Sequence, residues 1–207
     1  MDLGFFPNYM KKAKIIPVHK KGGRNKIENY RPLSLLPALS KIFEKTIHNQ
    51  LMKYFEDNKL LNESQYGFHA NHSTELAAVE MVEYLQKEID SNHIPLTIFI
   101  DFSKAFDTID HEILTAKLEH YGVINKELEW FKSYLSNRKH YTCINDTYSD
   151  ELTLNCGVPQ GSILGPTLFL IYINDLHRAS NILATINFAD DTNLCSSLCL
   201  AKLIHSG

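Results

Sequence analysis

The sequence predicts an α+β protein in which helices pack around a small antiparallel sheet. Apolar residues recur every three or four positions in some segments and at every second position in others, the spacings typical of helices and of strands. The two kinds of segment do not alternate regularly, which disfavours a parallel sheet built from βαβ units. With 207 residues and a hydrophobic content of 44%, the chain can bury the core of one domain, or of one domain with a lobe.

The first half of the chain contains one predicted strand and two predicted helices. Residues 14–18 form the strand, and a turn over 20–23 follows, where two glycines come after two lysines. A helix begins near Ser40 and runs to about residue 55, with apolar side chains at every fourth position. Ser73 can cap a second helix, whose inward face is expected to consist of Leu76, Val79, Val82, Leu85 and Ile89.

The second half is predicted to supply most of the sheet. Its elements, in chain order, are a strand over 96–102, a helix capped by Asp110, a short helix over 126–135, a hairpin over 142–155, a helix over 166–176, and strands over 182–188 and 193–195. The hairpin turns near Asn145-Asp146, residue types that favour turns. The helix at Pro166 is apolar nearly all round, so it should be buried. The last two strands are joined by a turn that carries Asp190 and Asp191.

The charge of the chain is unevenly distributed. Its formal net charge is −3 and its pI is about 6.4, which mildly disfavours a nucleic-acid-binding protein because such proteins are usually basic. Residues 11–27, however, contain seven lysines and arginines and no acidic residue. A run of this kind is either a solvated terminus or a surface that offsets the charge of phosphate groups.

The cysteines and the apolar segments indicate where the protein works. Four cysteines lack the paired CxxC spacing typical of zinc sites, so we expect reduced thiols. No signal peptide is evident, and the longest apolar run, over 163–173, is interrupted by Gly165-Pro166 and is too short to cross a bilayer. We therefore expect an intracellular protein of the nucleus or the cytoplasm, with no membrane partner.

Two acidic motifs follow β-rich apolar stretches, FIDFSKAFD at 99–107 and FADDT at 188–192. Brought together in the fold, Asp101 and Asp190 could hold two divalent metal ions on a phosphate-bearing substrate, because Mg²⁺ prefers oxygen ligands. Taken alone, an Asp-Asp pair is more often part of a turn or a cap, and Asp101 could equally cap a strand end. A third motif, GVPQGSILGP at 157–166, lies between the two and could by itself be a tight turn before a helix.

In their order and residue patterns, the three motifs resemble the palm of a reverse transcriptase, specifically that of non-LTR retrotransposons of the LINE and jockey type. Three upstream segments resemble fingers motifs of the same family, IPVHKKG at 16–22, NYRPLSLL at 29–36 and NESQYGFH at 62–69. The resemblance implies a right-hand polymerase fold with fingers and a palm, in which a small antiparallel palm sheet packs on helices. It implies a single domain fragment, with fingers and part of the palm over about 1–95, an incomplete palm over about 96–207, and the thumb absent.

The resemblance also implies the residues of a two-metal active site. The catalytic residues would be Asp101, Asp190 and Asp191. The same three side chains, together with the backbone oxygen of Phe102, would bind two Mg²⁺ ions, which Mn²⁺ could replace. Of the adjacent pair, Asp190 is the stronger candidate ligand, because neighbouring side chains diverge in direction.

Five further residues are implied to bind the incoming nucleotide: Lys20, Arg31, Phe106, Gln160 and Gly161. Arg31 and Lys20 would contact the triphosphate, and the ring of Phe106 would exclude a 2′-hydroxyl group. Gln160 would contact the nucleotide or the template strand, next to the close backbone approach that Gly161 permits. Without the flanking motif, Phe106 would be interpreted as an ordinary core aromatic residue.

The implied function is RNA-templated DNA synthesis, in which deoxynucleoside triphosphates extend the 3′-hydroxyl end of a DNA primer on an RNA template. Two alternatives stay open: a catalytically incompetent remnant of a mobile element that at most binds nucleic acid, and a reverse transcriptase of the group II intron or retron type. A viral RNA-directed RNA polymerase is disfavoured, because Ala189 stands where those enzymes usually have glycine. His69 stands where the family usually has arginine, which weakens one contact with phosphate or template. We expect the isolated chain to bind Mg²⁺ weakly and to show little processive synthesis.

Overall fold

The computed structural model describes residues 4–69 and 72–199. The chain forms two compact units, each assembled from two separate stretches of sequence. Unit 1 comprises Met1–Leu60 and Phe106–Tyr172, and unit 2 comprises Leu61–Ala105 and Ile173–Gly207. Helices combined with mainly antiparallel strands confirm the predicted α+β class.

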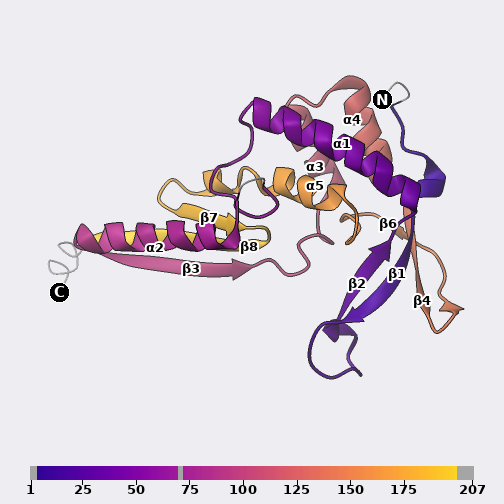
Figure 1. Ribbon diagram of the computed structural model, residues 1–207, viewed down its shortest axis with the longest axis horizontal. Helices are drawn as coiled ribbons and strands as arrows, with labels where there is room; N and C mark the ends of the chain where they lie inside the picture. The colour runs from indigo at the N-terminus through magenta and orange to yellow at the C-terminus, as the bar shows by residue number, and fades with distance from the viewer. Residues whose placement is uncertain (1–3, 70–71, 200–207) are drawn as a thin grey trace. The chain divides into compact units, whose positions relative to one another are not determined.

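Unit 1 contains a mixed sheet in the order β2-β1-β4-β5, with β6 paired to β4. Its strands are β1 (Lys12–His19), β2 (Tyr30–Leu35), β4 (Arg138–Ile144), β5 (Thr147–Tyr148) and β6 (Leu152–Leu154). β1 and β2 form an antiparallel hairpin, and β1 also pairs with β4 in parallel (Figure 1). The turn between β4 and β5 falls at Asn145 and Asp146, as predicted. Both residues have positive φ, 47° and 60°, which their short polar side chains tolerate better than most.

The helices of unit 1 are α1 (Ala38–Asp57), α3 (His111–His120), α4 (Asn125–Leu135) and α5 (Leu164–Ile173), with 3₁₀ turns η1 (Asn8–Met10) and η2 (Ile27–Asn29). α5 is buried on most sides, as its apolar sequence predicts. The buried carboxylate of Glu44 on α1 accepts hydrogen bonds from the N–H groups of Ile163 (2.7 Å) and Leu164 (3.4 Å). Glu44 therefore caps the start of α5 with a negative charge, where the helix dipole favours one.

The core of unit 1 combines aliphatic residues of α3 with an aromatic cluster. Leu114 and Leu118 of α3 are fully buried, and the N–H groups of its first turn donate to the side chain of Asp110, the predicted cap. The rings of Trp130 and Tyr134 on α4 stack with centroids 5.4 Å apart, and Phe6 meets both of them edge-on. These contacts attach the N-terminal segment to α4.

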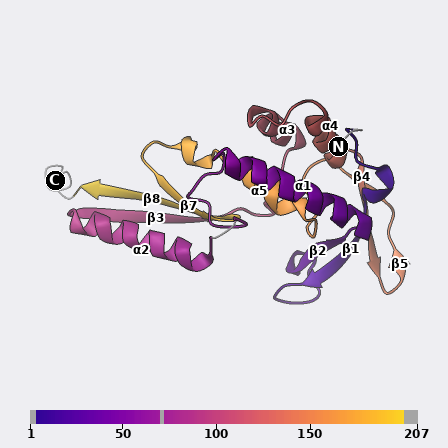
Figure 2. The same cartoon turned by 45° about the horizontal axis from the view of Figure 1, so that its top comes forward.

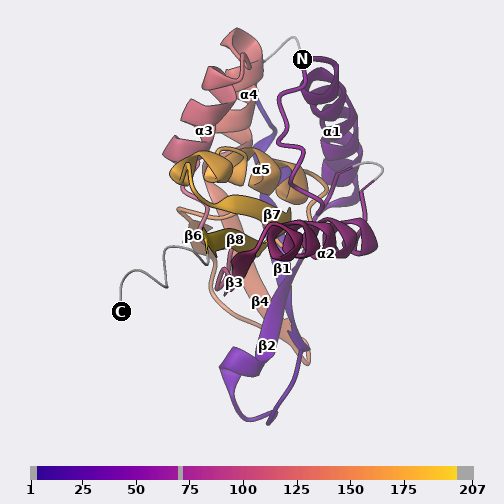
Figure 3. The same ribbon diagram turned by 90° about the vertical axis from the view of Figure 1, so that its left-hand side faces the viewer.

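Unit 2 is a three-stranded antiparallel sheet in the order β3-β8-β7, with one helix along it. Its elements are β3 (His93–Asp101), β7 (Ala184–Phe188), β8 (Asp191–Cys199), α2 (Thr74–Asp90) and the 3₁₀ turn η3 (Leu176–Ala179). α2 runs alongside β3 and the rest of the sheet (Figures 2 and 3). The hydroxyl of Ser73 accepts a hydrogen bond from the Leu76 N–H, which confirms the predicted cap of this helix.

The predicted inward face of α2 is wrong. Leu76, Val79, Val82 and Ile89 are each at least 47% exposed, and only Leu85 is half-buried. The helix packs through a neighbouring stripe, in which Ala77 is buried together with Ile186 and Cys195 of the sheet, and in which Met81 and Tyr84 are partly buried. Both stripes have helical spacing, so periodicity alone does not select between them. The small side chain of Ala77 allows a close approach to the sheet that the larger Leu76 does not.

The last hairpin is tighter than predicted. β8 begins at Asp191 and not at residue 193, so the turn consists of Ala189 and Asp190 alone. Asp191 pairs with Phe188 on one side and with Asp101 on the other. Ladder pairing with two neighbouring strands outweighs the weak strand preference of aspartate.

Candidate active site

The acidic residues of the two palm-like motifs gather at one end of the sheet in unit 2. Asp101 is the last residue of β3, and it lies directly opposite Asp191, the first residue of β8. Directly opposed residues of antiparallel strands point to the same face, with about 5 Å between their Cβ atoms. Both side chains are exposed, and Asp190 in the adjoining turn is half-buried. The sheet register therefore pairs two carboxylates that are far apart in the sequence.

This donor set suits a magnesium ion in chemistry but is not a closed cage. In the ranges 4–69 and 72–199, no three His, Cys, Asp or Glu side chains cluster closely enough to hold an ion together. Mg²⁺ prefers carboxylate oxygens and keeps several waters, so a pair of carboxylates plus substrate phosphate oxygens is an adequate set. The cross-strand partner of Asp101 is Asp191, whereas Asp190 sits beside them in the turn. The ligand roles of these residues, and that of the Phe102 carbonyl, stay predictions.

The turn that carries Asp190 is held by residues that sequence reasoning did not single out. Gln65 is buried, and its side chain bonds to the backbone N–H and C=O of Ala189. These contacts span 124 positions of sequence, which no local pattern predicts. The only available signal is the resemblance of the segment at 62–69 to a fingers motif, and that resemblance does not indicate a contact with the acidic turn.

The side chain of Gln160 in unit 1 is hydrogen-bonded to a carboxylate. Its side-chain NH₂ group donates to Asp107 at 2.9 Å from Oδ1 and 3.1 Å from Oδ2. Its backbone carbonyl accepts a hydrogen bond from the N–H of Ser34 on β2 at 2.7 Å. Gly161 follows with a φ of 119°, and a Cβ there would lie 2.6 Å from the Ser34 carbonyl oxygen. The close approach that Gly161 permits is thus to the protein's own strand β2.

Phe106 lies between a core aromatic residue and the motif at 157–161. Its half-buried ring stacks on Phe169 of α5, with centroids 4.9 Å apart, and its carbonyl accepts a hydrogen bond from the Val158 N–H. Gly157 donates its N–H to the carbonyl of Ile109 at 2.7 Å. Packing of the ring against α5 is compatible both with a core role and with the predicted role against a 2′-hydroxyl group, so that role stays a prediction.

The two basic residues of the predicted triphosphate contact belong to the β1–β2 hairpin. Lys20 directly follows β1, and its N–H donates to the carbonyl of Asn29, while Arg31 lies on β2 opposite Val18. Both are exposed, and neither forms an ion pair with an acidic residue in the part of the chain that the structure describes. Their positive charges are therefore free to meet an external anion.

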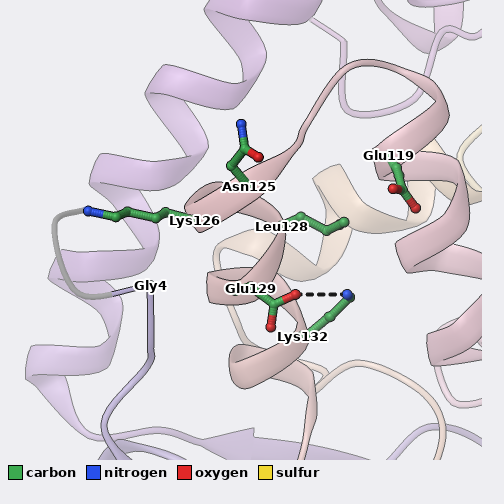
Figure 4. A pocket seen from close by; sticks show the side chains of 7 residues that line it. All are labelled: Gly4, Glu119, Asn125, Lys126, Leu128, Glu129 and Lys132. Carbon is green, nitrogen blue, oxygen red and sulfur yellow. Dashed lines mark hydrogen bonds and ion pairs between the residues drawn. The ribbon is translucent and has the colours of Figure 1, made fainter.

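One pocket of unit 1 lies away from the residues of the predicted site. Figure 4 shows a pocket of unit 1 lined by Gly4, Glu119, Asn125, Lys126, Leu128, Glu129 and Lys132, none of which belongs to the predicted site. The ion pair that it contains, between Glu129 and Lys132 at 2.8 Å, is exposed and therefore contributes little to stability.

Among the residues described, no helix combines the length and the apolar composition that a membrane span requires.

Comparison with known proteins identifies the family. Residues 18–205 match the family model described as reverse transcriptase (RNA-dependent DNA polymerase). The chain is 34% identical to the probable RNA-directed DNA polymerase from transposon BS and 31% identical to that from mobile element jockey, both of Drosophila melanogaster. Each match covers 93% of this chain and 22% of the relative, so the chain spans about a fifth of the length of these proteins.

Solved structures agree on the fold. Telomerase from Candida tropicalis in complex with a fragment of telomeric RNA superimposes with a TM-score of 0.67 over 98% of this chain and 38% of that protein, at 12% identity. Apo telomerase of the same species, truncated from its C-terminal domain, gives 0.64 at 14% identity over 97% of this chain and 46% of that protein. The right-hand polymerase fold and the resemblance to non-LTR retrotransposon enzymes are both confirmed. The chain belongs to the reverse transcriptase (RNA-dependent DNA polymerase) family.

Proposed function

We propose that this chain provides RNA-templated DNA synthesis, adding deoxynucleotides to the 3′-hydroxyl end of a primer on an RNA template. The observation that carries the proposal is the opposed pair of Asp101 and Asp191, with Asp190 beside it, at the end of the sheet in unit 2. Two Mg²⁺ ions would be held by Asp101, Asp190, Asp191 and the Phe102 carbonyl. These ions would activate the hydroxyl and neutralise the leaving pyrophosphate.

The residues of unit 1 would bind the nucleotide. Arg31 would meet triphosphate oxygens with its planar fork, and Lys20 would add a point charge. Both are exposed and have no acidic partner among the described residues, which supports this assignment. The ring of Phe106, braced by Phe169, would exclude a ribose 2′-hydroxyl group.

Gln160 has a defined orientation for its contact with the substrate. An ionised carboxylate only accepts hydrogen bonds, so the NH₂ group of Gln160 must face Asp107. The opposite atom, Oε1, receives no hydrogen bond from the described part of the chain. Gln160 would therefore present Oε1 as an acceptor to a sugar hydroxyl or a base N–H group.

A single-nucleotide primer-extension assay tests the proposal. The substrate is a DNA primer annealed to RNA, with one complementary deoxynucleoside triphosphate and Mg²⁺. We expect extension that Asp101→Asn and Asp191→Asn each reduce on the order of 100-fold or more, because the metal-binding charge is lost. Asp146→Asn makes the same chemical change in a surface turn where asparagine adopts the backbone readily, so it should leave extension unchanged.

Two results would contradict the proposal. One is extension that survives Asp101→Asn at the level of Asp146→Asn, which would place the chemistry elsewhere. The other is binding of the primer–template duplex without any Mg²⁺-dependent addition, which is the behaviour expected of the non-catalytic remnant.

A further inference from the structure

The turn between β7 and β8 contains a strained residue next to the predicted metal ligands. Ala189 has a φ of 55°, in the left-handed region that residues with a Cβ atom rarely occupy. This conformation costs about 1–2 kcal/mol per residue relative to a right-handed one. Asp190 and Asp191 follow immediately, so the geometry of Ala189 decides how the acidic pair is presented. Something in unit 2 must hold the turn in place.

The side chain of Gln65 holds the turn by hydrogen bonds to both backbone polar groups of Ala189. Oε1 of Gln65 accepts a hydrogen bond from the Ala189 N–H at 3.0 Å, and Nε2 donates to the Ala189 carbonyl oxygen at 3.4 Å. Oε1 also accepts a hydrogen bond from the Gly67 N–H at 2.8 Å, which orients the amide. Gln65 is only 7% exposed, so these bonds form with little competition from water.

The backbone around Gln65 is fastened to β7. The Asn187 N–H donates to the Ser64 carbonyl at 2.8 Å, and the Tyr66 N–H donates to the Asn187 carbonyl at 2.7 Å. Gly67 lies directly against the turn, since a Cβ atom there would stand 2.1 Å from the nitrogen of Ala189. Residues 64–67 thus form one clamp on the turn, hereafter the 64–67 clamp.

Helix α2 supports the clamp from outside. The hydroxyl of Tyr66 donates to the carboxylate of Glu80 on α2, and its ring packs against the cluster of Ala77, Ile186 and Cys195. Burial, together with the bond to Glu80, raises the pKa of Tyr66 to about 12, so the hydroxyl keeps its proton at neutral pH. Gln65 is therefore held between residues that are themselves anchored in the core of unit 2.

We propose that Gln65 is a positioning residue, which holds Ala189 in its strained conformation and thereby sets the directions of the Asp190 and Asp191 carboxylates relative to Asp101. The inference rests on the proposed metal-binding function of these acids and adds the residue that arranges them. Gln65 acts through the turn backbone and contacts none of the three acids by a hydrogen bond in the described residues. Residues that orient metal ligands from behind typically change metal affinity about 10–100-fold when they are removed.

The test compares three variants of the whole chain. Gln65→Met keeps the length of the side chain but removes its hydrogen bonds, and Gln65→Glu keeps an acceptor for the N–H groups of Ala189 and Gly67. Gln86→Met makes the first change at an exposed position of α2. One readout is Mn²⁺ affinity, measured by electron paramagnetic resonance. The other is hydrogen exchange of the Ala189 N–H without metal.

For Gln65→Met we expect Mn²⁺ affinity to fall about tenfold or more and exchange of the Ala189 N–H to accelerate. Gln86→Met should protect this N–H as the native chain does, and Gln65→Glu, which keeps the acceptor but loses the donor to the Ala189 carbonyl, should protect it more than Gln65→Met does. Adding Ala189→Gly to Gln65→Met should restore part of the Mn²⁺ affinity, because glycine reaches positive φ without the steric cost.

The two readouts separate failure of this inference from failure of the proposed function. Unchanged exchange of the Ala189 N–H in Gln65→Met would overturn the clamp whatever the metal does. Accelerated exchange with undiminished Mn²⁺ affinity would also overturn it, since the turn would not position the ligands. If the native chain bound no Mn²⁺, the proposed metal site would fail, and the exchange result would still show whether Gln65 holds the turn.

Discussion

Lys11 is a lysine of unit 1 with little solvent exposure. It is 4% exposed, its ammonium group donates to the Ser133 hydroxyl at 3.4 Å, and no carboxylate pairs with it among the residues described. Burial, and secondly the nearby charge of Arg138, lower the pKa of Lys11 below its ordinary value of 10.5. A single buried charge of this kind costs stability, which the surrounding aromatic core of unit 1 must offset.

We therefore predict that Lys11→Met raises the free energy of unfolding by about 1 kcal/mol at neutral pH. Because the pKa is lower in the folded chain, the unfolded chain binds more protons, and the stability of the native protein rises as pH increases toward 10.5. Lys11→Met should lack this rise. Urea unfolding between about pH 7 and 10 measures both effects.

Lys53→Met is the matched control, since Lys53 is exposed and pairs with Asp57 one helical turn away. It should change stability by less than about 0.5 kcal/mol and leave the pH dependence intact. A destabilised Lys11→Met variant would show instead that an unrecognised group compensates the buried charge.

At the scale of elements, the contacts between residues 106–111 and residues 156–161 explain the conformation of the motif at 157–166. Besides the Asp107–Gln160 bond, a ring nitrogen of His111 lies 2.7 Å from the Gly157 carbonyl oxygen. Gly157 has a φ of 79°, and a Cβ atom there would stand 2.7 Å from the Asp107 carbonyl oxygen. These contacts therefore require glycine at position 157 and a hydrogen-bond donor on the side chain at position 160.

Exchanging the donor and the acceptor tests the hydrogen bond between Gln160 and Asp107. Gln160→Glu sets two carboxylates face to face and should lower the free energy of unfolding by about 1–3 kcal/mol. Asp107→Asn in the same chain supplies a donor for the new carboxylate, so the double variant should recover at least half of the loss. Urea unfolding of the native, single and double variants gives the coupling free energy. Strictly additive effects would contradict the pair, and so would a Gln160→Glu penalty that persists when acid protonates the carboxyls.

The elements differ in how well the sequence predicts them. Turn and cap residues act locally, so the Asn145-Asp146 turn and the caps at Ser73 and Asp110 could be read directly. The buried face of α2 could not, because two stripes of that helix have helical spacing, and what distinguishes them is the packing of Ala77 against Ile186 and Cys195 of the sheet. Local patterns thus predict where an element starts and ends better than which side it buries.

At the scale of the whole molecule, each compact unit is built from two stretches of chain that are far apart in the sequence. The motifs were enough to predict the family and the fold, because their residue patterns and their order along the chain are specific. The contact of Gln65 with Ala189 was not predictable, because it depends on how the chain returns over 124 positions. The predicted division into fingers and palm near residue 95 concerns functional lobes and not packing units, and it stays a prediction.

The central claim is that the end of the sheet in unit 2 binds a divalent metal ion through Asp101 and Asp191. Titration of Mn²⁺ into the chain, followed by the loss of the free-ion signal in electron paramagnetic resonance, tests it without any need for turnover. We predict saturable binding that Asp101→Asn and Asp191→Asn each weaken about tenfold or more, while Asp146→Asn binds as the native chain does. Equal affinity in all four proteins would contradict the account.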